Sequence, residues 1–380
     1  MFGLTRRGAM NEDRISELPE ALLLQILSLL ATKDAIATSV LSKGWRSLWK
    51  MVPRLEFVSP IKKFATNVGR SLLLHQAPVL ESLHLRVRDS CDIGDIGVLA
   101  GIAFARHVRE FVLDVFSYKL VPFPSSLFFS ASLETLKLEN LIQLHVPSPV
   151  SMKSLKTLHL VFVTYKDDES FRNLLSGCPN LENLVLCRDF HLVEVGRSYT
   201  IVAPSLKRLS IHDYSDGRFK GGQFTYLLFK IKFPTGAIFY RLVYLEMYTN
   251  KAEWWRVLAL MLDSSPKLQV LKLVYIDENL HYGRTKWPVM EKWREPEYVP
   301  ECLLSHLEKF VWTIYNWDRE EEIEVATYIL RNAKRLKNAT ISARPIQYKE
   351  LSKLEERYKM LMELDGVVRA SNSCHLVFVE

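Results

Sequence analysis

The sequence SLETLKL at residues 132–138 returns as SLKTLHL at 154–160 and again as NLENLVL at 180–186. All three stretches follow the pattern L-x-x-L-x-L. The last two leucines of each stretch are two residues apart, so a β-strand would carry them on the same face. A strand that recurs at this interval indicates stacked structural repeats, in which each unit buries its leucines against the next.

The same pattern extends over most of the chain, and we expect its apolar positions to form one continuous core. The predicted anchors are Leu80, Leu83 and Leu85; Val108, Phe111 and Leu113; Leu133, Leu136 and Leu138; Leu155, Leu158 and Leu160; Leu181, Leu184 and Leu186; Leu206, Leu209 and Ile211; Leu242, Leu245 and Met247; Leu268, Leu271 and Leu273; Leu307, Phe310 and Trp312; and Leu336, Ala339 and Ile341. Most first anchors follow one another at 22 to 29 residues, which is the spacing of leucine-rich repeats. Two longer steps, of 36 and 39 residues, predict insertions near 215–240 and 274–300.

Two stretches between the predicted strands have apolar residues at helical spacing: DDESFRNLLSGCPN at 167–180 and AEWWRVLALMLDSSP at 252–266. The predicted fold is therefore α/β, a leucine-rich-repeat solenoid built on a curved parallel sheet. We expect its strands to line the concave side and its helical returns to cover the convex side. The adjacent Trp254 and Trp255 have two interpretations: they pack against a neighbouring repeat, or they form a recognition hot spot.

Residues 13–50 read DRISELPEALLLQILSLLATKDAIATSVLSKGWRSLWK and predict three short helices. Pro19 suits the first position of the first helix, and Thr32 and Ser42 suit the N-caps of the second and third. The leucines of the first helix cover too wide an arc for one buried stripe. So small a domain buries too little surface to hide all of them. The surplus either packs on the rest of this chain or faces a partner.

This stretch resembles an F-box of the plant type. The matching elements are Leu18-Pro19, the leucine-rich first helix, Lys33-Asp34, the run Thr38-Ser39-Val40-Leu41-Ser42-Lys43, and Trp45-Arg46-Ser47-Leu48-Trp49. Gly44 departs from the pattern, because a long basic or polar residue is common there. A glycine inside the third helix would cost roughly 1 kcal/mol.

The resemblance implies a partner. F-box proteins dock a Skp-type adaptor, which links them to a cullin and a RING subunit. Carried over position by position, the adaptor-binding residues are Leu18, Pro19, Leu23, Ile26, Leu27, Val40, Leu41, Trp45 and Trp49. Some of these must instead form the small internal core of the module.

The C-terminal fifth of the chain predicts two more helices and a last strand. Residues 318–334 start acidic and end basic, as suits a helix dipole, and residues 347–364 form a charged amphipathic pattern. This region resembles the FBD domain of plant proteins. The matching pieces are Cys302-Leu303-Leu304, Leu307-Glu308, Glu320-Glu321-Glu322, Ala326-Thr327-Tyr328-Ile329-Leu330, Leu336-Lys337, Cys374 and Leu376-Val377-Phe378. We interpret the domain as a cap that closes the solenoid.

The insertion at 274–300 carries aromatic residues among mixed charges. Exposed aromatic and arginine side chains are typical of protein interfaces. Tyr282, Trp287, Trp293 and Tyr298 are therefore possible target-binding residues. The alternative is that these rings fill the gap between the repeats and the C-terminal domain.

Charge and cysteine content argue against several other functions. The formal net charge of +7 over 380 residues is only mildly basic, so we expect no nucleic-acid binding. No run of uncharged apolar residues is long enough to span a membrane. The five scattered cysteines favour buried, reduced thiols in a protein of the cytoplasm or nucleus. We find no catalytic motif and expect no metal site and no cofactor, so the protein is predicted not to be an enzyme.

These patterns predict a flexible N-terminus at 1–12, an F-box at 13–55, leucine-rich repeats at 56–296 and an FBD domain at 297–380. The resemblance, which is to plant F-box/FBD/LRR-repeat proteins, implies a substrate-recognition adaptor of an SCF (Skp–cullin–F-box) ubiquitin ligase. Its repeats and FBD region would bind the target protein for ubiquitination. The alternative is a repeat-based receptor for a small ligand or peptide, whose F-box is vestigial or works outside a ligase.

Overall fold

The structure is a computed structural model, and its two compact units are Met1–Phe116 and Ser117–Glu380. It describes residue 15 and residues 17–59, 64–88, 93–188, 198–213, 230–232, 238–249, 254–275, 293–315, 320–343 and 354–379. The predicted flexible N-terminus and most of the two predicted insertions lie outside the described residues, as does Cys91.

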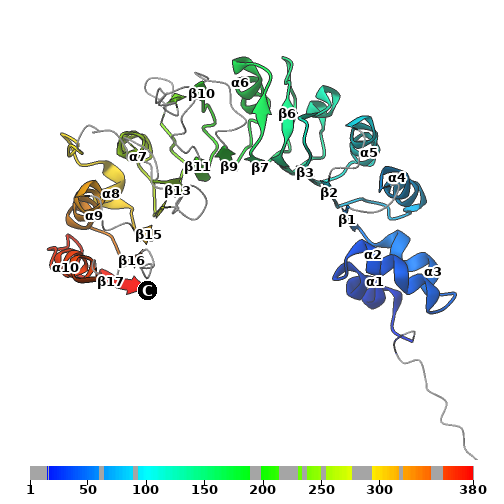
Figure 1. The fold of residues 1–380 in the computed structure, drawn as a ribbon, viewed down its shortest axis with the longest axis horizontal. Coiled ribbons are helices and arrows are strands. Elements are labelled where there is room, and N and C mark those ends of the chain that lie inside the picture. Colours follow the sequence, from blue (N-terminus) through cyan, green and yellow to red (C-terminus); the bar gives the residue numbers. More distant parts are fainter. Residues whose placement is uncertain are drawn as a thin grey trace, which may run out of the picture. The chain divides into compact units, whose positions relative to one another are not determined.

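The first unit joins a helical module to three parallel strands (Figure 1). Its elements are α1 (Glu20–Ser28), α2 (Thr32–Ala37), η1 (Thr38–Val40), α3 (Trp45–Leu48), η2 (Trp49–Met51), β1 (Arg54–Val58), α4 (Phe64–Leu74), β2 (Ser82–Arg88), α5 (Ile93–Ala105) and β3 (Glu110–Phe116). Leu55, Leu83 and Phe111 occupy matching positions of the three strands and are at most 2% exposed. The strands therefore share one core, and α4 and α5 are the helical returns between them.

The second unit continues the same alternation of strand and return. Its elements are β4 (Val121–Pro122), η3 (Ser125–Phe129), β5 (Thr135–Asn140), β6 (Ile142–Leu144), β7 (Thr157–Val161), β8 (Thr164–Tyr165), α6 (Asp168–Ser176), β9 (Asn183–Arg188), β10 (Ser198–Thr200), β11 (Arg208–Asp213), β12 (Lys230–Lys232), β13 (Tyr244–Tyr248), α7 (Trp254–Ser264), β14 (Val270–Val274), α8 (Glu301–Ser305), β15 (Lys309–Tyr315), α9 (Glu320–Asn332), β16 (Asn338–Ala343), α10 (Leu354–Asp365) and β17 (His375–Val379). The strands β5–β7–β9–β11–β13–β14–β15–β16–β17 neighbour one another in that order and are parallel. The strands β4–β6–β8 form a smaller sheet, and β10 pairs with β12.

The middle anchor of each repeat occupies the same position in this sheet. The aligned residues are Leu136, Leu158, Leu184, Leu209, Leu245, Leu271, Phe310, Ala339 and Leu376. Every anchor predicted from the sequence, in both units, is at most 5% exposed. The predicted α/β solenoid of parallel strands with helical returns is confirmed, and its insertions leave the register unchanged.

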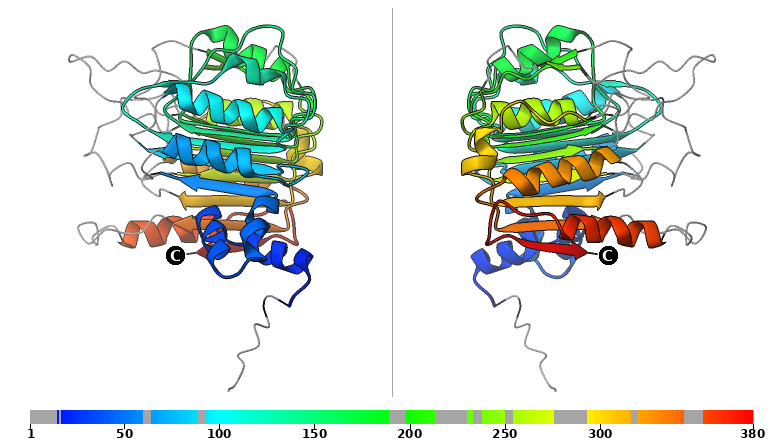
Figure 2. Two further views of the ribbon diagram at one scale, coloured as in Figure 1. Left: turned by 90° about the vertical axis from the view of Figure 1, so that its right-hand side faces the viewer. Right: turned by 90° about the vertical axis from the view of Figure 1, so that its left-hand side faces the viewer.

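Among the described residues of the second unit, helical returns cover one face of the sheet and no helix covers the other, which we call the open face (Figure 1). Figure 2 shows α7 and α9 lying along the strands of this unit. The α7 residues Trp254 and Trp255 are both buried, and the Trp254 ring packs edge-on against Trp312 of β15 at 5.6 Å between centroids. The packing interpretation of this tryptophan pair therefore holds.

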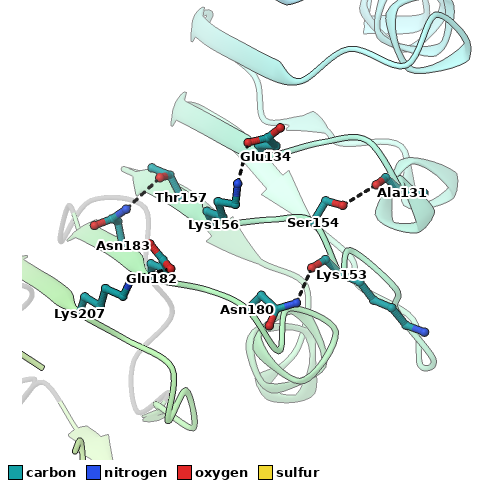
Figure 3. Close-up of polar contacts among 10 residues, drawn as sticks. All are labelled: Ala131, Glu134, Lys153, Ser154, Lys156, Thr157, Asn180, Glu182, Asn183 and Lys207. Atoms are coloured by element: carbon teal, nitrogen blue, oxygen red, sulfur yellow. Dashed lines mark hydrogen bonds and ion pairs between the residues drawn. The ribbon is translucent and has the colours of Figure 1, made fainter. Parts of the chain in front are cut away.

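Successive repeats are joined by hydrogen bonds just before each strand begins. The Glu134 carbonyl accepts from the backbone N–H groups of Lys156 and Thr157 at 2.9 and 3.0 Å. Side chains reinforce the same step, as Figure 3 shows. The Lys156 ammonium donates to Glu134 at 3.0 Å, and two repeats later Lys207 donates to Glu182 at 2.7 Å. Each repeat thus fixes the start of the next strand.

The capping predictions for the helical module are wrong in detail. Pro19 is the N-cap of α1 rather than its first helical residue. Thr32 is the first residue of α2, and its hydroxyl accepts the backbone N–H of Glu56 at 2.6 Å instead of capping the helix. Ser42 does not cap α3, which begins directly after Gly44. Gly44 therefore lies at the helix start, and the predicted cost of an interior glycine does not apply.

The C-terminal elements follow the predicted order. Helix α9 lies within the predicted range 318–334. Of the residues that helical spacing assigns to its inner face, Ala326, Ile329 and Leu330 are buried and Ile323 is half-buried. Helix α10 lies in the predicted range 347–364 apart from its last residue, Asp365. Residues 347–353 of that range lie outside the described residues. The final strand β17 pairs in parallel with β16.

Candidate functional site

The helical module of the first unit has a small internal core. Two residues of α1 point into it, together with residues from α2, α3 and η2. Its members are Leu23, Leu27, Ala35, Trp45, Leu48, Trp49 and Val52, each at most 7% exposed. Leu24 and Ile36 pack against this cluster and are half-buried.

Many other large apolar side chains of the module remain exposed. Along α1 and the residues just before and after it, Leu18, Leu22, Ile26 and Leu29 are 36%, 44%, 42% and 87% exposed. Their spacing of four, four and three residues places them on one side of a helix. We call these four residues the α1 stripe. An exposed apolar row of this size is typical of a protein interaction surface.

A further exposed apolar surface is the pair of residues Val40 and Leu41 at the end of η1. Val40 is 85% exposed and Leu41 is 65% exposed. These two residues and the α1 stripe come from the same module of fewer than forty residues, whose interior is already filled by the core. The module therefore has more apolar surface than its own core can bury.

The structure sorts the nine predicted adaptor-binding residues into two groups. Leu18, Pro19, Ile26, Val40 and Leu41 are exposed. The other four lie in the internal core and are corrected from adaptor contacts to core residues: Leu23, Leu27, Trp45 and Trp49. The physical reason is that a three-helix module needs its largest side chains to hold its own helices together.

Sequence reasoning left three exposed leucines out of the predicted set: Leu22, Leu29 and Leu30. The signal that could have found them was the wide apolar arc of the first helix. A buried stripe accounts for only one side of such an arc, so the opposite side must be exposed or covered by a partner.

The α1 stripe forms one wall of a groove of about 900 Å³. The opposite wall is the end of the helical module and the turn before β2, with Pro53, Pro78 and Val79 among its residues. Arg54 and Glu81 also line the groove and form an ion pair at 3.5 Å. The groove is lined mainly by apolar residues, and its polar members are Gln25 and Ser28 of α1 and this ion pair.

Hydrogen bonds join the helical module to the first repeat. The Lys50 carbonyl accepts the backbone N–H groups of Gln76 and Ala77 at 2.7 and 3.1 Å. The His75 ring lies with Nε2 2.7 Å from the Val52 carbonyl. These contacts hold the wall of the groove at a fixed position relative to α1.

Arg106 of the turn after α5 stabilises the same junction. Its guanidinium donates to the carbonyls of Leu72, His75 and Ala77 at 3.2, 3.0 and 2.9 Å. Burial lowers the pKa of His75 below its ordinary value, and the Arg106 charge lowers it further, against the opposing effect of the hydrogen bond to Val52. The imidazole is therefore neutral, and Nε2–H is the donor to Val52.

The possible target-binding residues are only partly described. Tyr282 and Trp287 lie outside the described residues. Tyr298 is 79% exposed. Trp293 is 8% exposed and packs edge-on against Tyr328 of α9 at 5.7 Å between ring centroids. Trp293 is therefore a packing residue, as the alternative interpretation expects, and it is corrected from an exposed target contact.

The described cysteines are buried thiols. Cys178, Cys187, Cys302 and Cys374 are buried and lie outside any disulfide among the described residues. Burial raises the pKa of Cys178 and of Cys302 to about 12, which leaves both as unreactive thiols. Among the residues that the structure describes, no group of three His, Cys, Asp or Glu side chains is placed to hold a metal ion. None of the described helices is both long and apolar enough to cross a membrane.

Comparison with known proteins bears on all three regions. The F-box domain matches residues 15–57, the Leucine Rich Repeat matches residues 154–179, and FBD matches residues 295–341. An F-box/FBD/LRR-repeat protein of Arabidopsis thaliana is 52% identical over 434 residues, covering 98% of this chain and 94% of that protein. The chain belongs to the F-box/FBD/LRR-repeat family.

Two other Arabidopsis thaliana proteins support this assignment. A second F-box/FBD/LRR-repeat protein is 50% identical over 98% of this chain and 94% of its own length. An FBD-associated F-box protein is 49% identical over 99% of each chain. The helical module is therefore an F-box, a domain that implies binding to a Skp-type adaptor, and the architecture is that of an F-box adaptor protein.

Proposed function

We propose that this protein is the substrate-receptor subunit of an SCF-type ubiquitin ligase in the cytoplasm or nucleus. Its F-box docks a Skp-type adaptor, which brings a cullin and a RING subunit. Its leucine-rich repeats and FBD region hold the target protein. The receptor itself contributes no catalytic group.

The single observation that carries this proposal is the exposed apolar surface of the F-box. Covering a large aliphatic side chain stabilises a complex by roughly 1.5–3 kcal/mol when the burial is complete. The α1 stripe and the Val40–Leu41 pair offer several such side chains. Because the F-box core is already filled, this surface gains most from a partner protein.

In this proposal the receptor acts by positioning. A target held on the repeats presents its lysines at a high effective concentration to the ubiquitin-charged enzyme. The hydrogen bonds of Arg106 and His75 support that role within the first unit, because they keep the F-box from swinging against the first repeat.

The proposal is tested by adaptor binding of the purified chain. The double variant Leu22→Glu/Ile26→Glu places two charges in the α1 stripe and should weaken binding to a plant Skp-type adaptor by roughly a hundredfold or more. The matched control is Leu73→Glu, because Leu73 is an apolar residue of the same unit that is 78% exposed and lies outside the groove. Circular dichroism should show all three proteins folded.

Two results would contradict the proposal. Folded wild-type protein that binds no Skp-type adaptor would favour the alternative, a repeat-based receptor with a vestigial F-box. Equal adaptor binding by the stripe variant and the wild type would mean that this surface is not the docking site.

A further inference from the structure

The open face of the sheet in the second unit carries a connected group of polar side chains on β11, β13 and β14. Arg208 is opposite Tyr244 in the sheet register, and Glu246 is opposite Lys272. The neighbours of these residues along each strand, such as Leu209 and Leu245, point into the core. The polar group therefore lies on the side of the sheet opposite the buried anchors.

Glu246 is the fixed centre of this group. One carboxylate oxygen accepts the Tyr244 hydroxyl at 2.6 Å, and the other accepts the Lys272 ammonium at 3.0 Å. His212 Nε2 lies 3.4 Å from the same oxygen as Lys272. The nearby His212 ring, the Tyr244 hydroxyl and the Lys272 ammonium lower the pKa of Glu246 to about 2, although partial burial opposes the shift. The carboxylate is thus ionised, and its contacts hold the Tyr244 ring in place.

Arg208 uses this fixed ring as a platform. Its guanidinium carbon lies 4.1 Å from the centroid of the Tyr244 ring, and the residue is exposed. Within the part of the chain that the structure describes, no carboxylate forms an ion pair with Arg208. A guanidinium that stacks on an aromatic ring keeps its planar fork of N–H donors available at its edge.

A second exposed cation lies further along the same row. In the sheet register, Tyr244 of β13 is opposite Val270 of β14, which is opposite Lys309 of β15. Lys309 is exposed and, like Arg208, forms no ion pair among the described residues. Strands are about 4.8 Å apart, so three steps place Arg208 and Lys309 roughly 14 Å apart. An extended segment spans that distance with roughly four residues.

The chemistry of this surface selects its partner. A planar guanidinium binds carboxylate and phosphate groups through paired hydrogen bonds. Because Arg208 is already held by Tyr244, it loses little freedom when it binds. We propose that the open face of β11, β13, β14 and β15 binds an extended target segment whose anionic side chains contact Arg208 and Lys309. This rests on the proposed function only in assigning the segment to a target.

The anionic groups could be the carboxylates of acidic residues or the phosphates of modified residues, and the test separates these sources. The full chain, without any adaptor, is applied to an array of nine-residue peptides. Every peptide is present in three versions with glutamate, phosphoserine or glutamine at two positions four residues apart. We expect binding to the glutamate or phosphoserine versions and none to the glutamine versions.

Two matched variants identify the contact. Arg208→Ala should weaken binding of the selected peptide by at least roughly tenfold in fluorescence anisotropy. Arg208→Lys should recover only part of that loss, because lysine lacks the planar fork. Lys207→Ala removes the adjacent cation, which is engaged by Glu182 before the strand, and should leave binding unchanged.

The proposal is overturned if the three peptide versions bind alike, if none binds, or if Arg208→Ala behaves like Lys207→Ala. Because the assay contains no Skp-type adaptor, these outcomes are independent of F-box docking. A chain that binds the adaptor but no anionic peptide retains its proposed function and loses this target site.

Discussion

The F-box and the repeats of the second unit handle their large apolar residues in opposite ways. In the repeats, every anchor of the L-x-x-L-x-L pattern is at most 5% exposed. In the F-box, the core takes one side of α1, while Leu29 on the other side is 87% exposed and Val40 is 85% exposed. The repeats bury their large apolar residues within the chain, whereas the F-box leaves many of its large apolar residues exposed. Exposure therefore separates residues that hold the fold from residues available to a partner.

The largest expected effect is on the free energy of unfolding, and it compares one leucine in the repeats with one leucine in the F-box. Leu245→Ala removes a fully buried anchor and should lower the free energy of unfolding by about 2–5 kcal/mol. Leu41→Ala removes a 65% exposed side chain and should change it by less than about 0.5 kcal/mol. Urea denaturation measures both. Equal losses would mean that Leu41 is buried in the folded protein.

The next effect concerns the polar junction between the F-box and the first repeat. Arg106→Ala leaves the carbonyls of Leu72, His75 and Ala77 without their donor and should cost about 1–3 kcal/mol. Arg109→Ala is a suitable control, because Arg109 is an exposed arginine of the same segment. Thermal unfolding of the two variants is the measurement, and identical midpoints would show that the junction does not depend on Arg106.

Helix ends also differ between the two regions. No side chain caps α1, α2 or α3 of the F-box, whereas Asp167 caps α6 by accepting the Ser170 backbone N–H at 2.7 Å. Asp167→Ala should therefore cost about 1 kcal/mol, measured by urea denaturation at pH 7. Asp167→Asn keeps an acceptor and should cost less.

The cap also predicts a pH dependence. Hydrogen bonds from Ser170 hold the pKa of Asp167 below its ordinary value of 3.8. A depressed carboxyl pKa stabilises the fold fully above that ordinary value, and the contribution is lost as the pH falls through the lower folded pKa. Wild-type stability should therefore fall more steeply with acidification below pH 3.8 than that of Asp167→Asn. Parallel curves would contradict this account of the cap.

The smallest effect is expected on the exposed ion pairs between repeats. Lys156 and Glu134 meet at 3.0 Å, but their side chains are 55% and 40% exposed. Solvent screens such a pair, so a double-mutant cycle should give a coupling of about 0.2–1 kcal/mol. A coupling several times larger would show that the charged ladder, rather than the buried leucines, holds adjacent repeats together.

The repeats could be predicted closely because their signal is local and recurs. Leu136, Leu158 and Leu184 have the same neighbours in the sequence and the same place in the sheet. Strand β1 also has this spacing, at Val52, Leu55 and Phe57, but it directly follows the F-box and was not predicted as a repeat. The small sheet β4–β6–β8 could not be predicted from the sequence because its strands have only two or three residues.

The site was less predictable, because its features depend on contacts between distant residues. The cap assigned to Thr32 fails because Glu56, 24 residues away, takes the threonine hydroxyl. Both sides of α1 are apolar, so the sequence could not separate Leu27 in the core from Ile26 at the surface. The Arg208–Tyr244 platform joins strands separated by an insertion, and only the register brings the two residues together.

Hydrogen–deuterium exchange of the full chain, with and without a saturating plant Skp-type adaptor, tests the central claim most directly. The claim is that the exposed apolar residues of the F-box form the surface that binds the adaptor. Exchange should slow at residues 18–30 and 38–41, and stay unchanged in β13 and β14. Slower exchange confined to the repeats, or no change in the F-box of an adaptor-bound chain, would contradict it.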